Sequence, residues 1–256
     1  MKFQEQKNSL KRTEKVKGLW EEPIVKKVMD AVGLAIVAVY PHLAPVGVLV
    51  DTGVNKTLEA SIGKKQGEIL EELIKSKSLT EDDVEDLDFI ASFSKLLMAA
   101  NRTTGNGKIQ YMTRLFERTI CAEDKEYDFY EECLGKLERL SKREIIALIL
   151  LKQAGLDFEE SERVKQEQQE KNPINEIIED REKYFEYPFR LKEMWSAFID
   201  KASKDLGCER AEIIDIVSGL RGSGLCRQFP ENTMPIGSEE VYHTTYYFER
   251  MYVQIL

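Results

Sequence analysis

The chain has 256 residues, of which 42% are hydrophobic and 32% charged, and its formal net charge is −9. This length is enough for one or two domains with a buried core. The acidic balance disfavours a protein that is held on nucleic acid by bulk electrostatics, because phosphates repel negative charge. The four cysteines show no CxxC spacing, and neither of the two histidines lies near them in the sequence. We therefore expect free thiols and no metal or cofactor.

Residues 1–30 form a basic leader that contains Trp20 among scattered lysines and arginines. The first apolar stretch begins only at Ala31, and no small-residue cleavage pattern follows it, which is untypical of a secretory signal peptide. We expect a cytoplasmic protein. Because a basic segment beside an apolar one is attracted to an anionic membrane surface, peripheral membrane association is a second expectation.

Residues 31–50 (AVGLAIVAVYPHLAPVGVLV) contain no Asp, Glu, Lys or Arg. The run has the roughly 20 residues that a bilayer-crossing helix needs, but two prolines interrupt it and would break such a helix. We predict an apolar hairpin of two short arms over residues 31–54, buried against a helical core or a partner, with a lipid surface as the alternative. The candidate interaction residues of this hairpin are Val32, Leu34, Ile36, Val37, Val39, Pro41, Pro45, Val48, Leu49 and Val50.

A series of amphipathic helices follows, recognised by apolar residues spaced three and four apart. The acidic run before the second helix is expected to end in carboxylates that cap that helix, and Ser141 with Glu144 forms a capping box. Gly155 is expected to end the last helix in a left-handed conformation. These elements define a helical domain over residues 31–155, with helices expected near 67–77, 89–101, 108–120, 130–137 and 142–153.

Residues 156–188 form a charged connector. Its stretch EESERVKQEQQEKN is almost purely polar and is followed by Pro173. Such a composition is typical of either a solvated helix or a disordered segment. We therefore place a domain boundary here.

The last segment, residues 189–256, changes character toward its end. Helical spacing runs to Gly207, a second short helix precedes the glycines of GSG, two strand-like stretches lie near 225–229 and 240–244, and a helix closes the chain. This order is that of a winged helix. The predicted fold is thus mainly α, a helical bundle with an apolar N-terminal hairpin and a C-terminal winged-helix-like unit that contains a small β-hairpin. An irregular helical bundle closed by a β-hairpin is the alternative.

A winged helix would place residues 211–220 in a DNA major groove. The charges oppose this, since Glu209, Glu212 and Asp215 outnumber Arg210 along this helix. A protein-interaction role is therefore favoured over DNA binding. In the DNA-binding alternative, the nucleic-acid contacts would be Arg210, Arg221 and Arg227.

Enzymatic chemistry has no support in the sequence. GxxxxGK[ST], GxGxxG, GxSxG and HExxH are all absent. Glu179, Glu182 and Lys183 are similar to a nuclease carboxylate–lysine set. They fall, however, on a charged helical segment with no strands nearby, where we expect these side chains to form a solvent-exposed face of the helix. No catalytic, cofactor-binding or metal-binding residue is predicted.

Taken in order, the apolar hairpin, DDVEDLDFIASF, KIQYMTRLFERTI and LSKREIIALILL resemble bacterial helical proteins of the abortive-infection alpha (Abi-alpha) type over residues 31–154. Proteins of this type are associated with defence against phage, generally without an assigned enzymatic activity. The resemblance carries over no catalytic residue.

We therefore expect a non-enzymatic phage-defence effector or sensor that acts through oligomerisation, partner binding or membrane contact. Two alternatives stay open, a winged-helix transcriptional regulator and a structural helical subunit of a permanent complex. The expected partners are a second copy of the chain, another protein or an anionic membrane surface, ahead of nucleic acid.

Overall fold

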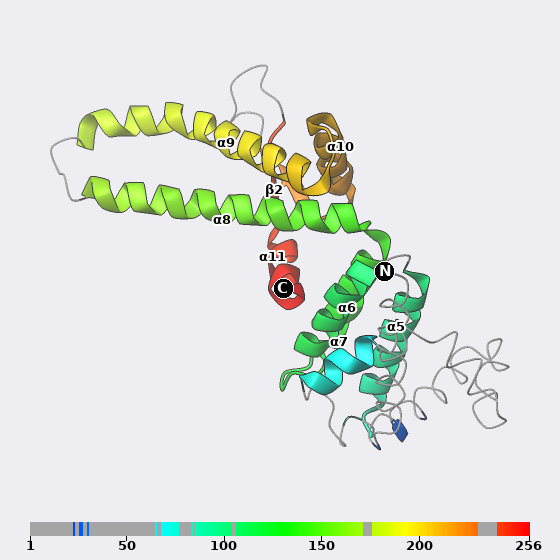
Figure 1. Cartoon of the computed structure of the whole chain (residues 1–256). Coiled ribbons are helices and arrows are strands. Elements are labelled where there is room, and N and C mark those ends of the chain that lie inside the picture. The colour runs from blue at the N-terminus through cyan, green and yellow to red at the C-terminus, as the bar shows by residue number, and fades with distance from the viewer. Residues whose placement is uncertain are drawn as a thin grey trace, which may run out of the picture. The chain divides into compact units, whose positions relative to one another are not determined.

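The computed structural model of the chain (Figure 1) describes residues 65, 68–76, 83, 85–103, 106–170, 176–229 and 240–256, and the separate positions 23, 26, 27 and 30. At residues 106, 165–170, 176–186 and 188 it describes the backbone alone. The predicted apolar hairpin over 31–54, with all its candidate interaction residues, lies outside the described residues.

The chain divides into two compact units. The first consists of Met1–Arg139 with Gln254–Leu256, and the second of Leu140–Val253. The described residues are mainly helical, with a small two-stranded antiparallel sheet near the C-terminus. The prediction of a mainly α fold is confirmed.

Three helices make up most of the described part of the first unit: α5 (Leu87–Arg102), α6 (Asn106–Thr119) and α7 (Tyr127–Arg139). Residues 68–75 are helical as well. Each helix buries the apolar stripe that its sequence spacing predicts, and the stripes meet in one core. The fully buried apolar side chains of this core include Leu73, Phe89, Phe93, Leu96, Met112, Leu115, Phe116, Tyr130 and Leu137.

Four aromatic rings form the centre of that core. The ring of Phe116 lies 5.3 Å from Phe89, 5.5 Å from Phe93 and 5.5 Å from Tyr130, measured between centroids. Two of these three contacts are edge-to-face, the arrangement that the aromatic quadrupole favours. Phe116 thus joins α5, α6 and α7 through one side chain.

Asp86 caps the N-terminus of α5, as the acidic run before that helix predicts. Its carboxylate accepts hydrogen bonds from the backbone N–H groups of Asp88 and Phe89. The other carboxylate oxygen accepts from Lys125 Nζ at 2.7 Å and from the Tyr127 hydroxyl at 2.8 Å. The hydrogen bond from Lys125 is the main reason that the pKa of Asp86 falls from 3.8 to about 2. This cap therefore also ties α5 to the segment that leads into α7.

In the second unit, α8 (Lys142–Glu170) and α9 (Glu176–Leu206) are long helices that lie side by side and run antiparallel (Figure 1). The predicted capping box is confirmed at the start of α8. The Ser141 N–H donates to Glu144 Oε2 at 2.6 Å, and the Glu144 N–H donates to Ser141 Oγ at 3.1 Å. We call the paired helices the α8–α9 arm.

The predicted helix end at Gly155 is wrong, because α8 continues through this residue to Glu170. Gly155 is not among the glycines with positive φ. A glycine inside a helix costs about 1 kcal/mol relative to alanine, which packing against a neighbouring helix can offset. Here α9 supplies that neighbour. Residues 156–170, for which the sequence left a helix and a disordered segment open, are helical.

The arm is followed by α10 (Arg210–Leu220), the short 3-10 helix η5 (Arg221–Ser223), strands β1 (Cys226–Gln228) and β2 (Tyr242–Thr244), and α11 (Tyr246–Ile255). Gly207 ends α9 and Gly224 follows η5, and both have positive φ, which glycine adopts without strain. The strands pair antiparallel with Arg227 opposite His243. The predicted short helix, the two strands and the terminal helix are thus present.

Among the described residues, no helix combines the length and the apolar character that crossing a bilayer requires.

Candidate functional site

The second unit leaves large apolar side chains uncovered along the α8–α9 arm. Phe189 is 59% exposed, and Leu156, Val164 and Tyr187 are exposed as well. Tyr187 also packs edge-to-face on Phe158 of α8, with the ring centroids 5.7 Å apart. Exposed apolar side chains on both helices of the arm are candidates for contact with a partner.

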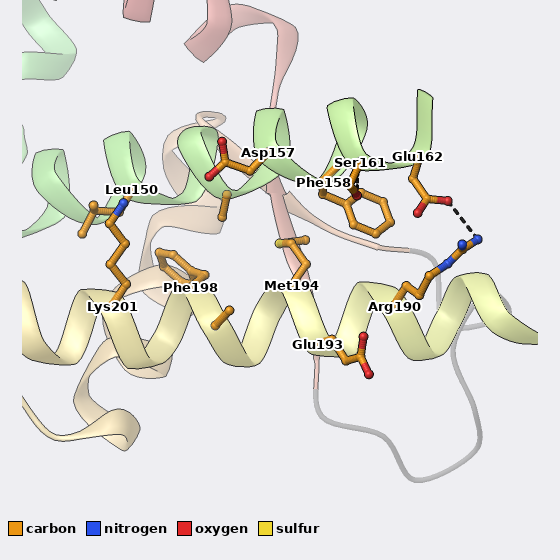
Figure 2. Close-up of a pocket in the computed structure, with 12 residues that line it drawn as sticks. Leu150, Asp157, Phe158, Ser161, Glu162, Arg190, Glu193, Met194, Phe198 and Lys201 are labelled. Atoms are coloured by element: carbon orange, nitrogen blue, oxygen red, sulfur yellow. Dashed lines mark hydrogen bonds and ion pairs between the residues drawn. The ribbon is translucent and has the colours of Figure 1, made fainter. Parts of the chain in front are cut away.

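A cleft of about 370 Å³ opens between α8 and α9 on this arm (Figure 2). Its apolar wall consists of side chains from both helices. Phe158 comes from α8, and Met194 and Phe198 come from α9. The small residues Ala154 and Ala197 also line it, so the two helices do not fill the space between them.

Charged side chains lie at both ends of this cleft. At one end, Arg190 Nη2 on α9 forms an ion pair of 2.9 Å with Glu162 Oε2 on α8, as Figure 2 shows. At the other end is Lys201, near Leu150. Asp157 and Glu193 complete the charged lining and are exposed.

The outward residues of α10 are largely acidic or already paired. Arg210 donates to Asp200 and, at 3.2 Å, to the Ser196 hydroxyl, both on α9. Glu212 accepts from Arg143 of α8 at 2.7 Å. The surface of α10 therefore offers DNA few cations that are not already bound to carboxylates.

The other two candidate nucleic-acid contacts lie near the two-stranded sheet. Arg227 Nε donates to His243 Nε2 at 2.9 Å across the strand pair, and Arg221 Nη1 lies 3.4 Å from Gln228 Oε1. Burial and the Arg227 charge lower the pKa of His243. In the neutral imidazole Nε2 can accept the hydrogen bond from Arg227, and the lowered pKa favours that form.

The structure does not bring the three candidate arginines together. Arg210 and Arg221 flank the ends of α10, separated by about 16 Å of helix rise. The sequence did not indicate the cleft, since its lining depends on which faces of α8 and α9 oppose each other. The sequence pattern that relates to the cleft is a helical spacing of three and four residues, which places Met194, Ala197, Phe198 and Lys201 on one face of α9.

Thiol and metal chemistry find no support in the described residues. None of the four cysteines, which all lie among the described residues, forms a disulfide. Burial raises the pKa of Cys121 to about 12 and that of Cys226 to about 11, so neither is a reactive thiolate at neutral pH. Within the part of the chain that the structure describes, no group of three or more His, Cys, Asp or Glu side chains could hold a metal ion.

Comparison with known proteins finds no family model, no curated protein and no solved structure that matches this chain.

Proposed function

We propose that the chain is a non-enzymatic phage-defence effector or sensor that acts by binding, either to a second copy of itself, to a protein partner or to a membrane surface. The observation that carries this proposal is the exposure of large apolar side chains at separate positions along the α8–α9 arm, among them Phe189 and Tyr187. Aromatic side chains of this kind are enriched in the buried centres of protein interfaces. The defence role itself rests on the Abi-alpha resemblance of residues 31–154.

A winged-helix-like organisation of residues 189–256 belongs to the same proposal. It is supported by the order of the elements, in which α9 ends at Gly207, α10 follows, β1 and β2 form a two-stranded ribbon, and α11 ends the chain. In a winged helix of this order, α10 would correspond to the recognition helix.

For this unit we favour a protein partner over DNA. The carboxylates of Glu209, Glu212 and Asp215 lie on or beside α10, and Arg210 is bound to Asp200. DNA carries one negative charge per about 1.7 Å of helix axis, so these carboxylates would be repelled. Fluorescence anisotropy with a labelled random duplex at about 150 mM salt should show no saturable binding. Tight, salt-dependent binding that is lost in Arg227→Ala would instead support the regulator alternative.

The membrane part of the proposal rests on the predicted hairpin 31–54, which lies outside the described residues, and on its basic flank, of which Lys26 and Lys27 are described and exposed. Cosedimentation of pure protein with vesicles that contain anionic lipid tests it directly. Binding should fall in Val37→Asp, which places a charge inside the apolar run. If the protein pellets with neither anionic nor neutral vesicles, the membrane version is wrong.

Self-association or partner binding through the arm is tested by size-exclusion chromatography with light scattering over a range of concentrations. We expect the wild-type mass to rise with concentration, and Phe189→Ser to reduce this rise because it removes an apolar contact. The matched control is Leu87→Ser, which changes an equally apolar and more exposed residue of the first unit. A strictly monomeric wild-type protein would remove the second copy as the partner.

A further inference from the structure

The cleft on the α8–α9 arm has the size and the lining of a small-molecule site. Its volume of about 370 Å³ falls within the roughly 300–1,000 Å³ that is typical of ligand pockets. The wall is mostly apolar, with the aromatic rings of Phe158 and Phe198 and the thioether of Met194 (Figure 2). Such a wall suits a flat or extended apolar molecule.

One hydrogen-bond donor in this lining has no acceptor among the described residues. Arg190 uses Nη2 for its ion pair with Glu162, while its Nε is buried and makes no hydrogen bond in the part of the chain that the structure describes. A buried donor without an acceptor costs free energy, which an oxygen atom of a bound molecule would recover.

The charges around the cleft restrict what that oxygen can belong to. Near Arg190 lie two carboxylates, Glu162 and Glu193, so this end has a net charge of about −1. A phosphate or carboxylate placed there would be repelled by both. An uncharged acceptor, such as a carbonyl or sulfonyl oxygen, accepts from Arg190 without that repulsion.

We propose that the α8–α9 cleft binds an uncharged small organic molecule with an apolar, flat or extended body and an oxygen acceptor that receives the Arg190 Nε hydrogen bond. Ala154 and Ala197 leave the space for the body of this molecule, and Phe158 and Phe198 contact it. The inference concerns the second unit alone and does not rest on the defence role.

Dansylamide is a suitable probe, because it has an aromatic body and uncharged sulfonyl oxygens and fluoresces more strongly in an apolar site. Trp195 neighbours Phe198, with the ring centroids 5.1 Å apart, so its emission should be transferred to the bound probe. The chain has two tryptophans, and Trp20→Phe leaves Trp195 as the single donor. Titration of the Trp20→Phe protein should give saturable sensitised dansyl emission with one site per chain.

Two variants fill the cleft without removing a polar contact, Ala154→Leu on α8 and Ala197→Leu on α9. Each should weaken dansylamide binding by about tenfold or more, since the added isopropyl group occupies the space of the ligand. Ala211→Leu, at an exposed position of α10 outside the lining, is the matched control and should bind as the parent does. Melting curves followed by circular dichroism establish that each variant is folded.

Arg190→Lys tests the hydrogen bond while a positive charge is kept at this position. Lysine keeps the positive charge beside Glu162 but lacks Nε, so binding should weaken roughly two- to tenfold, the range expected for one hydrogen bond. A monoanionic analogue, dansyl glycine, should bind more weakly than dansylamide.

Three results would overturn the proposal. The first is the absence of saturable sensitised emission. The second is equal affinity in Ala154→Leu, Ala197→Leu and Ala211→Leu, which would place the probe elsewhere. The third is a wild-type protein that is dimeric and does not bind dansylamide, together with an Ala197→Leu variant that is monomeric. This combination would show that a second copy fills the cleft.

Discussion

The two units use their apolar side chains differently. In the described part of the first unit, four buried aromatic rings pack against one another, and Phe116 contacts Phe89, Phe93 and Tyr130. In the second unit, two long helices lie against each other but leave a cleft and exposed rings along their length. Among the described residues, the large exposed apolar side chains belong to the second unit except for Leu87 and Leu256.

This difference indicates that the apolar residues of the first unit contribute mainly to stability and those exposed on the arm mainly to binding. Burying a Phe side chain contributes about 1.5–3 kcal/mol through the hydrophobic effect, so the first unit gains stability from residues that no partner can reach. Exposed side chains such as Phe189 gain nothing until something covers them. We therefore expect substitutions in the first unit to act on stability, and substitutions on the arm to act on binding.

Phe116→Ala should give the largest effect and tests the first half of this comparison. Removing a fully buried phenylalanine typically costs about 3–5 kcal/mol of unfolding free energy, because transfer and cavity terms add. The measurement is urea denaturation followed by circular dichroism. Phe189→Ala is the matched control on the arm and should change stability by less than about 0.5 kcal/mol. Similar losses in the two variants would contradict the division between the units.

Asp86→Ala should give the next largest effect, about 1–2 kcal/mol, since it removes the cap of α5. Asp86→Asn keeps a capping oxygen but loses the charge that pairs with Lys125, so its loss should be smaller. Because the pKa of Asp86 is lowered to about 2, its contribution is full above about pH 3.8 and is lost as the pH falls toward 2. An unchanged acid-unfolding profile in Asp86→Asn would count against this pairing.

Ser141→Ala should cost about 1 kcal/mol by removing the capping box of α8 in the second unit. Ser218→Ala on α10 is the control, because its hydroxyl bonds only a carbonyl within the same helix. Thermal melts of the two variants give the comparison. Equal melting temperatures would mean that packing along α9, and not the cap, fixes the start of α8.

The smallest effect should come from His243. Burial and Arg227 lower its pKa below the ordinary 6.5, so the unfolded chain binds the proton more tightly than the folded one. Stability should therefore fall as the pH drops below about 6.5. His243→Gln, which can still accept from Arg227 but does not titrate, should lose this dependence. The same slope in both proteins would assign the dependence to other groups.

Much of the local structure could be predicted from the sequence because its causes are local. The Ser141–Glu144 capping box, the Asp86 cap and the helix end at Gly207 each depend on residues within a few positions of one another. The strand positions near Cys226 and Tyr242 follow from composition in the same way.

What the sequence could not provide depends on contacts between different helices. Gly155 was expected to end a helix, but α9 packs alongside and α8 continues. The binding of Arg210 to Asp200, and the cleft between Ala154 and Ala197, follow from how two helices face each other. Helical spacing indicates which side chains share a face of one helix, but not which face of another helix they meet.

The most direct test of the central claim is photo-crosslinking at one exposed apolar position in each unit. p-Benzoylphenylalanine is placed at position 189 on the arm or at position 87 in the first unit, and the irradiated cells are examined for covalent adducts. We expect one adduct of defined mass at 189, either a homodimer or a single partner, and none at 87. Equal adducts at both positions, or an adduct at 87 alone, would contradict the assignment of binding to the α8–α9 arm.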